Sequence, residues 1–391
     1  MKRLLVSMLF LCCFFATSVK ALTVTGIIIE KDSGIPVESA NVFFANTTIG
    51  TTTNTFGYFS LSTAHKGVSD LVVSHLSYEI FMISIPLEKD SMNILIQLKT
   101  KMYPINSVEL IGNDPNRDSY LYIFKAGVIG TSENSKKCRL INPSVLHFKK
   151  SFEKDNQEEW TLNADTDSVL IIKNEALGYT IKYNLEHFLA HKRSSTLERG
   201  FYGYPFFEDE ISTADYPNRI SRLRKSAYEG SKLHFFRSLY SRTLEENGFE
   251  VYTVNQRSPK PNDTDKYGLL ADPVFIGKPN VVLEQTEKYL DIYNYLVPDS
   301  VTGSVVLAFA EPFEVRYIRK AEEERYFYSR YFFKGLEVRF RSQTSIIRLK
   351  DGSIRFFSNG SYEKADELIT IGYWSYLKLA DTLPFNYVYR K

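Results

Sequence analysis

Cysteine is scarce in this sequence, and long apolar runs are absent behind its first 21 residues. Two of the three cysteines, Cys12 and Cys13, lie in an apolar stretch near the start, which leaves Cys138 alone behind it. A single cysteine cannot form an internal disulfide, so burial of apolar side chains must stabilise the fold. No later segment is apolar for the ~18 residues that a membrane-spanning helix needs, so none is predicted there.

The first 21 residues have the pattern of a secretory signal. Lys2 and Arg3 precede an apolar run of 13 residues, Leu4 to Ala16, which Ser7 alone interrupts. Small residues at Val19 and Ala21 then suit cleavage by signal peptidase. We therefore expect residues 1–21 to be a signal peptide and the protein to be exported to the periplasm, the outer membrane or the cell surface.

Charge of either sign is not in excess. The full chain carries a net charge of +2, and without residues 1–21 it has 45 basic and 46 acidic side chains. A balance of −1 gives no electrostatic reason to expect nucleic-acid binding. The 28 Phe and 26 Tyr residues, against 2 Trp, favour β structure, and 391 residues suggest two or three domains.

Residues 22–100 contain short β-rich runs separated by turn residues, with no helical period. Turns are predicted at 32–36, where Gly34 and Pro36 reverse the chain, and at 54–57, which ends in Gly57. The expected strands are Thr23–Glu30, Asn41–Ala45, Ile49–Thr53, Tyr58–Leu61, Leu71–Ser74, Glu79–Ile85 and Asn93–Leu98. About seven strands in fewer than 80 residues indicate an all-β sandwich.

The order of these residues resembles the carboxypeptidase regulatory-like domain, which has a transthyretin-like (prealbumin-like) sandwich. The motifs that carry the resemblance are Gly34-Ile35-Pro36-Val37, Ala40-Asn41-Val42, Gly50-Thr51-Thr52-Thr53-Asn54, Gly57-Tyr58-Phe59 and Leu71 to Glu79. Ser77 stands where family members usually have Gly. The resemblance implies an architectural module without catalytic residues, found in envelope proteins of Bacteroidetes-type bacteria.

Residues 101–391 are expected to form an α+β, mainly antiparallel β body, and a subdivision near residue 250 is an open alternative. A helix start is predicted at Asn113-Asp114-Pro115, leading into Tyr120–Lys125. The expected strands are Leu140–His147, Trp160–Asn163 and Val169–Lys173, followed by Tyr179–His191 with Tyr179, Ile181, Tyr183, Leu185 and Leu189 on one face.

Two basic helices and a C-terminal β region complete the prediction. The helices are expected at Asn218–Glu229 and Lys232–Glu246, with Gly248 ending the second. Strands at Ser345–Leu349 and Ile354–Phe357 flank the turn Lys350-Asp351-Gly352-Ser353 as a hairpin, and a short helix is expected at Tyr373–Asp381. Strings here, such as Gly372-Tyr373-Trp374, resemble the rear portion of envelope proteins that begin with the same sandwich, and that resemblance implies no mechanism.

The two basic helices supply the candidate ligand-binding residues. Arg224, Tyr228, His234 and Arg237 could surround a carboxylate or phosphate group if they faced one cavity. The alternative is a solvated basic face on two amphipathic helices, in which case these side chains would be dispersed and exposed.

No catalytic or metal-binding motif is found. A zinc peptidase site needs three ligands, and the six histidines form no His-Glu-x-x-His or His-x-x-Glu string. His187 and His191 have helical ligand spacing but lie on the segment with strand alternation. Cys138 could act as a nucleophile with His147 or His234, although burial is the simpler role for a lone cysteine. No catalytic residue, metal or cofactor is therefore predicted.

The leading hypothesis is a non-enzymatic exported envelope protein. Its sandwich would be a spacer or docking module, and its C-terminal body would bind a partner, with an envelope protein or a glycan as the expected class. The first alternative is an envelope hydrolase with a site near Arg224 and His234. The second is an outer-membrane β-barrel with a periplasmic sandwich, which the predicted helices disfavour. Membrane association stays open.

Overall fold

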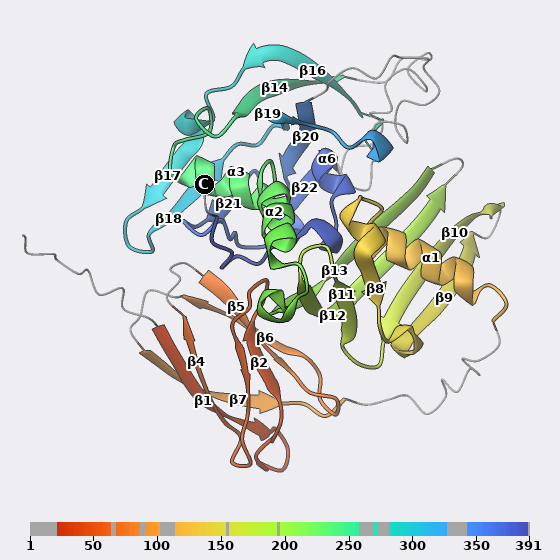
Figure 1. Ribbon diagram of the computed structural model, residues 1–391, viewed down its shortest axis with the longest axis vertical. Coiled ribbons are helices and arrows are strands. Elements are labelled where there is room, and N and C mark those ends of the chain that lie inside the picture. The colour runs from red at the N-terminus through yellow and green to blue at the C-terminus, as the bar shows by residue number, and fades with distance from the viewer. Residues whose placement is uncertain are drawn as a thin grey trace, which may run out of the picture.

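The computed structural model describes residues 22–63, 68–86, 91–101, 114–153, 156–193, 196–257, 270–271, 281–326 and 342–389. Three units are visible in Figure 1: an N-terminal sandwich, a middle sheet, and a C-terminal pair of sheets, with helices α2 and α3 between them. Each unit is built largely from strands, which fits the high content of Phe and Tyr.

The N-terminal unit is the predicted sandwich, and all seven strands are confirmed. A three-stranded sheet, in the order β4-β1-β7, packs on a four-stranded sheet, in the order β3-β2-β5-β6. The core between them includes Val24, Phe59 and Val73, each at most 1% exposed. The strands are β1 (Leu22–Glu30), β2 (Asn41–Phe44), β3 (Gly50–Thr52), β4 (Tyr58–Thr63), β5 (Val68–Ser74), β6 (Phe81–Pro86) and β7 (Ser91–Leu98).

Gly57 confirms the predicted turn chemistry of this sandwich. Its φ is +69°, and a Cβ there would collide with the backbone oxygen of Ile28. The backbone N–H of Ile28 donates to the carbonyl of Gly57 over 2.8 Å. Only glycine readily adopts this left-handed conformation and also leaves room for the close approach of the two strands.

The middle unit is a six-stranded antiparallel sheet. The strand order is β8-β11-β12-β10-β9, and β13 pairs with the other edge of β12. Helix α1 (Arg117–Val128) covers it and packs Phe124 against Phe188, with ring centroids 4.8 Å apart. The strands are β8 (Cys138–Leu140), β9 (Leu146–Glu153), β10 (Asn156–Thr166), β11 (Leu170–Asn174), β12 (Tyr179–Arg193) and β13 (Thr196–Asp209).

Two sequence predictions in this unit need correction. The expected strand Leu140–His147 is two strands, because a short 3-10 helix at Pro143–Val145 separates β8 from β9. The expected single face of β12 ends at a bulge between Leu185 and His187. An extra residue reverses the alternation, so Phe188 and Ala190 are buried instead of Leu189.

The two basic helices are present, and the second is shorter than predicted. Helix α2 (Pro217–Tyr228) matches the expected range closely. Helix α3 (Lys232–Tyr240) ends well before Gly248, because Arg242 adopts a left-handed conformation with φ of 57°. The N–H groups of Thr243 and Arg242 donate to the carbonyls of Ser238 and Leu239, which is the Schellman arrangement that ends helices.

The C-terminal unit contains two further antiparallel sheets, in the orders β15-β16-β14-β19-β20-β22 and β17-β18-β21. Helix α3 packs Phe235 and Phe236 into the core that these sheets share. The strands are β14 (Phe249–Arg257), β15 (Leu270–Ala271), β16 (Val281–Tyr289), β17 (Leu296–Asp299), β18 (Ser304–Ala308), β19 (Phe313–Ala321), β20 (Ser342–Leu349), β21 (Ser353–Phe356) and β22 (Leu368–Gly372).

Two C-terminal predictions are also wrong in detail. The turn at Gly352 exists, but it joins strands of different sheets: β20 pairs with β19 and β22, whereas β21 pairs with β18. The expected hairpin is therefore a crossover. The expected helix Tyr373–Asp381 is two short pieces, α6 (Tyr373–Tyr376) and a 3-10 turn at Leu379–Asp381.

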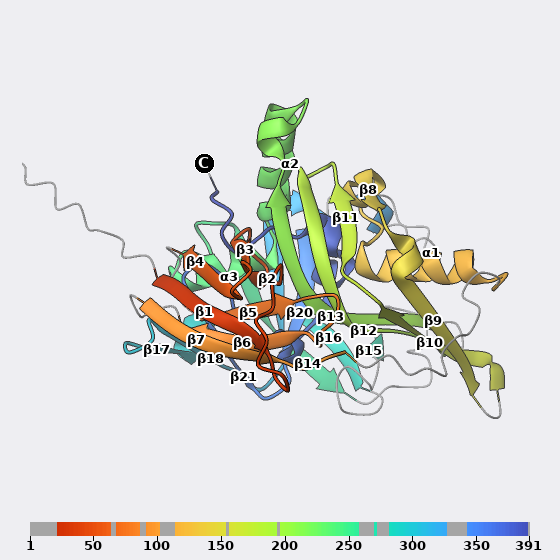
Figure 2. The same ribbon diagram turned by 90° about the horizontal axis from the view of Figure 1, so that it is seen from below.

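The sandwich is joined to the middle sheet by backbone hydrogen bonds. Asn46 N–H donates to the Pro205 carbonyl over 2.7 Å, and Phe207 N–H donates to the Thr47 carbonyl over 2.9 Å. Phe43 also packs on Phe206, with centroids 5.3 Å apart. Figure 2, seen from below, shows β12 and β13 between α2 and α1. Within the described ranges no helix combines the length and apolarity that a bilayer span requires.

Candidate functional site: a pocket where three units meet

A pocket of about 330 Å³ lies where the sandwich, the middle sheet and the C-terminal unit come together. We call it the junction pocket. Its lining combines aromatic rings with a few polar groups, which is typical of small-molecule sites. The lining residues are Asn46, Asp70, Tyr183, Phe201, Tyr202, Gly203, Tyr204, Pro205, Ser231, Lys232, Leu233, Tyr362, Ala365, Trp374, Leu377, Leu379, Asp381, Thr382, Leu383 and Phe385.

Strand β13 contributes two tyrosines to the lining of the junction pocket, Tyr202 and Tyr204. Tyr202 is 37% exposed and Tyr204 is 8% exposed, and the Tyr202 hydroxyl donates to that of Tyr204 over 3.4 Å. Burial is the main reason why the pKa of Tyr204 is raised far above its usual value. This phenol therefore stays neutral and keeps both its donor and its acceptor capacity at physiological pH.

The start of helix α3 forms a second wall. The Ser231 hydroxyl accepts a hydrogen bond from His234 N–H over 3.1 Å and so caps the helix. Lys232 follows as the first helical residue and lines the pocket. The indole N–H of Trp374 donates to the Gly230 carbonyl over 2.7 Å, which fixes this wall to the C-terminal unit.

Asp381 is the most deeply buried charged group of the lining, at 7% exposed. Its Oδ1 accepts a hydrogen bond from Asn134 over 2.9 Å. Its Oδ2 is buried and has no hydrogen-bond partner in the described part of the chain. Burial raises the pKa of this carboxyl to about 6, because the charged form is poorly solvated there.

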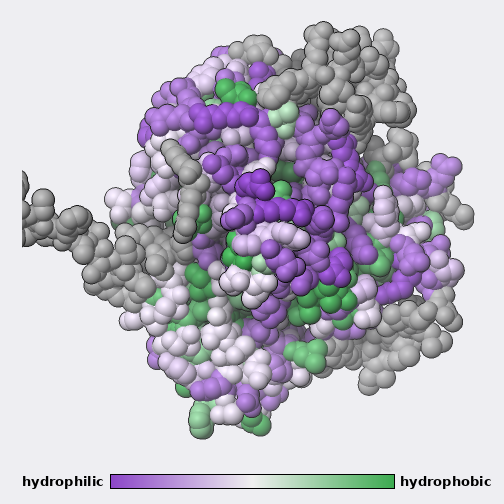
Figure 3. Space-filling model, viewed as in Figure 1, coloured by the Kyte–Doolittle hydropathy of each residue, from purple (hydrophilic) through white to green (hydrophobic). Residues whose placement is uncertain are grey.

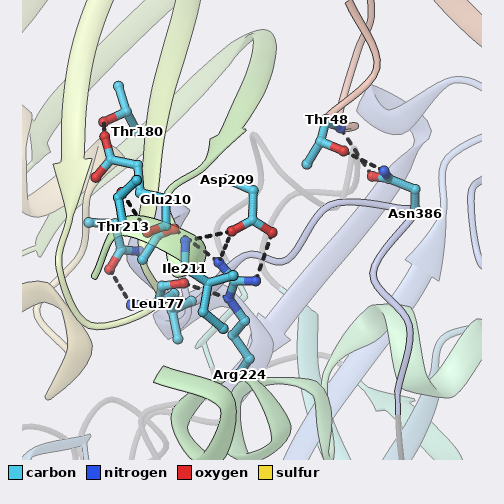
Figure 4. A network of polar contacts seen from close by, with 11 residues as sticks. Thr48, Leu177, Thr180, Asp209, Glu210, Ile211, Thr213, Arg224 and Asn386 are labelled. Carbon is cyan, nitrogen blue, oxygen red and sulfur yellow. Dashed lines mark hydrogen bonds and ion pairs between the residues drawn. The ribbon is translucent and has the colours of Figure 1, made fainter. Parts of the chain in front are cut away.

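Residues 383–387, which we call the C-terminal strap, connect the pocket to the sandwich. Phe385 N–H donates to the Asn46 carbonyl over 2.7 Å. Asn386 pairs with Thr48 through two hydrogen bonds, one of which is the 3.0 Å bond from the Thr48 N–H to Asn386 Oδ1. Figure 4 shows this pair. The strap thus closes the pocket from the C-terminal side.

The sequence-predicted ligand residues lie beside the junction pocket, close to one another. His234 stacks on Tyr228 with centroids 4.6 Å apart, and the Arg237 guanidinium lies 5.5 Å from the same ring. Arg224 is one helical turn before Tyr228 on α2. The four residues therefore lie near one another, but the polar groups of Arg224, His234 and Arg237 have hydrogen-bond partners within the protein.

Arg224 is buried, at 5% exposed, and acts as a clamp. Its guanidinium donates to the carbonyls of Leu177 and Gly178 over 2.7 and 2.9 Å and forms two hydrogen bonds to Asp209. It also lies 3.8 Å from the centre of the Tyr179 ring. Figure 4 shows it reaching from α2 to Asp209 and the Leu177 carbonyl.

Arg237 and His234 also form hydrogen bonds within the protein. Arg237 donates to the carbonyls of Asn359, Phe385 and Tyr387, two of which belong to the C-terminal strap. His234 is buried, and its Nδ1 accepts a hydrogen bond from Gly230 N–H over 3.2 Å. Burial lowers the pKa of His234 to about 4, so the imidazole is neutral at physiological pH.

These contacts correspond neither to an open ligand site nor to a fully solvated basic face on the two helices. Hydrophilic side chains gather over α2 in the centre of Figure 3, and Arg219 and Arg222 are exposed there. Arg224, Tyr228 and His234 are buried, so the solvated face does not include them. Arg224 and His234 already have hydrogen-bond partners within the protein, and a role of these residues in ligand binding stays a prediction.

Cys138 and the histidines lack the geometry of a catalytic or metal site in the described ranges. The Cys138 thiol donates to the Asn134 carbonyl over 3.5 Å, and burial raises its pKa to about 12, so it remains protonated. His147 pairs with Asp167 instead. His187 and His191 lie on the extended strand β12, and no group of three potential ligands is found among the described residues.

Solved structures that resemble this chain include three distant likenesses, with TM-scores too low to support a common fold. A type II cohesin–X-dockerin complex from Acetivibrio cellulolyticus is 17% identical at a TM-score of 0.20, over 29% of this chain and 79% of that chain. A protein described as carbohydrate-binding, from Bacteroides uniformis, is 9% identical at 0.18, over 48% and 98%. A membrane-associated protein of unknown function from Bacteroides fragilis is 9% identical at 0.18, over 90% and 97%.

Among curated proteins, none matches this sequence. One protein family does match, over residues 24–110, which span the seven-stranded sandwich and a short segment behind it. The motifs around Gly34, Gly50 and Gly57 that carried the resemblance all lie inside that range. The N-terminal unit of this chain is therefore a CarboxypepD_reg-like domain.

Proposed function

We propose that this protein is a non-enzymatic binding protein of the bacterial cell envelope, in which the sandwich is a docking module and the C-terminal body binds a glycan. The observation that carries the proposal is the junction pocket, which all three units line. The sandwich contributes Asn46 and Asp70 to the lining, so docking of the sandwich completes the pocket.

A sugar suits the chemistry of this lining. Aromatic side chains offer flat apolar surfaces to the C–H faces of a sugar ring, and the partly exposed rings of Tyr202 and Phe385 supply such surfaces. The phenol groups of Tyr202 and Tyr204 can hydrogen-bond to sugar hydroxyls. A volume of about 330 Å³ is at the lower end of the range for ligand sites, which fits one or two sugar rings.

A binding role rather than catalysis is supported by the state of the reactive groups. The CarboxypepD_reg-like domain resembles modules without catalytic residues, and the one thiol behind residue 21, Cys138, is half-buried, with its pKa raised to about 12 by that burial. His234 is neutral and its Nδ1 is occupied by Gly230 N–H. These groups pack the protein instead of facing a substrate.

Replacement of Tyr202 by alanine tests the site. We expect affinity for a bound oligosaccharide to fall about tenfold, since loss of one aromatic stacking partner costs about 1–3 kcal/mol. Tyr122→Ala is the matched control, because Tyr122 is an exposed tyrosine of α1 outside the pocket. Isothermal titration calorimetry against a panel of soluble oligosaccharides measures both variants.

A second variant blocks the pocket without disturbing a core. Ala365 is an exposed residue of the lining, so Ala365→Trp should fill the entrance and abolish binding, whereas Ala365→Ser should bind as the wild type does. A panel in which no oligosaccharide binds the wild type, or in which Ala365→Trp binds unchanged, would contradict the proposal.

The envelope location is the remaining part of the proposal, and it is supported by the signal-like residues 1–21. Expression of the full chain in a Gram-negative host, followed by fractionation, tests it. We expect the protein in the periplasmic or membrane fraction and cleaved behind Ala21. Retention of the uncleaved chain in the cytoplasm would refute this part and leave the pocket assignment untouched.

A further inference from the structure

Three cationic side chains gather at the Phe201 side of the junction pocket. Lys232 and Phe201 line the pocket, and the Lys378 ammonium lies 5.6 Å from the centre of the Phe201 ring. Lys378 stands between Leu377 and Leu379, which are also lining residues. Arg199 precedes Phe201 by two residues on β13 and so projects from the same face of that strand.

Among the described residues, no anionic group acts on the Lys378 ammonium. The charged groups that act on Lys378 are Lys232 and Arg199, both positive. Together with burial, they lower the pKa of Lys378 to about 8. Within the described residues, the side-chain ammonium groups of Lys378 and Lys232 form no hydrogen bond or ion pair, although burial of unpaired charges is costly.

Arg199 adds an independent observation. Its side chain packs against Gly127 of α1, and its Nε is buried without a hydrogen-bond partner in the described part of the chain. A buried N–H donor without an acceptor is unfavourable, because no hydrogen bond compensates for its lost contact with water. The arrangement therefore leaves a strong donor unsatisfied in the protein on its own.

Two other features do not neutralise the cluster. The C-terminal end of α1, where Gly127 and Gly130 pack against Arg199 and Lys378, offers only the weak attraction of a helix dipole. The hydrogen bonds that the lining carboxylates accept come from other groups: Asp70 accepts from Ser84, and Asp381 accepts from Asn134 through its Oδ1. Neither acts on Lys378.

We infer that the glycan of the junction pocket carries an anionic group, a carboxylate or a sulfate ester, which binds between Lys232, Lys378 and Arg199. The inference rests on the proposed function, and it names the ligand class as acidic oligosaccharides. A carboxylate or sulfate would supply the acceptors that the three cations lack, and such charge-assisted hydrogen bonds are the stronger kind.

The experiment compares neutral, uronic-acid-containing and sulfated oligosaccharides of equal length by titration calorimetry at low salt. We expect the wild type to bind at least one acidic series about tenfold more tightly than the neutral one. Lys378→Met should remove this preference, so that the acidic and the neutral series bind it with similar affinity. Lys149→Met, at an exposed lysine of β9, should leave both affinities unchanged.

Thermal unfolding gives a second readout that does not depend on the sugar. Lys378→Met keeps the apolar stem and removes a desolvated charge, so we expect the ligand-free variant to melt at a higher temperature than the wild type. Inorganic sulfate should raise the melting temperature of the wild type and of Lys149→Met more than that of Lys378→Met.

The possible failures are distinguishable. Equal binding of acidic and neutral oligosaccharides, or a preference that survives in Lys378→Met, would overturn the inference and leave the proposed function standing. Absence of any oligosaccharide binding would overturn the proposed function and, with it, the glycan part of the inference. An equal response of all three proteins to sulfate would overturn the anion site itself.

Discussion

Replacement of Arg224 by alanine is expected to lower the free energy of unfolding by about 3–5 kcal/mol. The change leaves the buried carbonyls of Leu177 and Gly178 without donors and removes the cation that lies over the Tyr179 ring. The Asp209 carboxylate contributes less to the loss, because 40% of its side chain is exposed and water replaces the guanidinium there. Urea denaturation followed by far-UV circular dichroism measures the change.

Two matched variants show whether geometry or charge is responsible. Arg222→Ala removes an exposed arginine from the same helix and should change stability by less than about 0.5 kcal/mol. Arg224→Lys keeps the charge but cannot donate to two carbonyls and a carboxylate together, so most of the loss should persist. Full recovery in Arg224→Lys would show that the clamp acts through charge alone.

The pH dependence of stability should change strongly when either of two buried groups is replaced. For His234, burial lowers the pKa from 6.5 to about 4, so the unfolded state binds more protons between these values. The contribution of His234 to the free energy of unfolding is therefore full above pH 6.5, and it is lost as pH falls toward 4. At 1.36 kcal/mol per pKa unit, this amounts to about 3 kcal/mol.

The pKa shift of Asp381 changes stability with pH in the opposite direction. Burial raises its pKa from 3.8 to about 6, so the folded state binds more protons between these values. Its contribution is present below pH 3.8 and is lost as pH rises through 6, again by about 3 kcal/mol. The two effects offset one another in the wild type. Together, these two groups should therefore change its stability little between pH 4 and 6.5.

Single variants should separate the two contributions. In Asp381→Asn, we expect stability to fall steeply as pH drops from 6.5 to 4, because only His234 remains. In His234→Asn, we expect stability to fall as pH rises from 4 to 6. Urea midpoints measured at half-unit intervals test both slopes, and the exposed histidine in His187→Asn serves as control. Parallel curves for the wild type and either variant would contradict the assignment.

Local sequence patterns predicted the sandwich well, because its strands are bounded by turn residues whose conformations are fixed by their chemistry. Gly57 is an example, with its left-handed backbone and close approach to Ile28. The same reasoning placed α2, whose first residue is Pro217. The prediction failed at the bulge beside Leu185, where one extra residue exchanges the buried and exposed faces of the strand. It also failed at Arg242, whose left-handed backbone ends helix α3.

The candidate site could not be predicted, because its parts are distant in sequence. Asn46 and Phe385 form one hydrogen bond across most of the chain, and no local pattern indicates that pairing. The partners of Arg224 and Arg237 are largely backbone carbonyls, which every residue carries, so side-chain motifs cannot identify them. The tyrosines of β13 were visible in the sequence, but only the docked sandwich shows which face of them is enclosed.

The C-terminal strap has a consequence for how the protein matures. The bond between Thr48 and Asn386 joins positions 338 residues apart, whereas the sandwich is held by contacts within fewer than 80 residues. Since distant contacts form late in folding, the sandwich can fold while the rest of the chain is still disordered. The junction pocket would then be complete only when the C-terminal strap binds the sandwich. Incompletely synthesised chains would therefore carry a folded sandwich but could not yet bind a ligand.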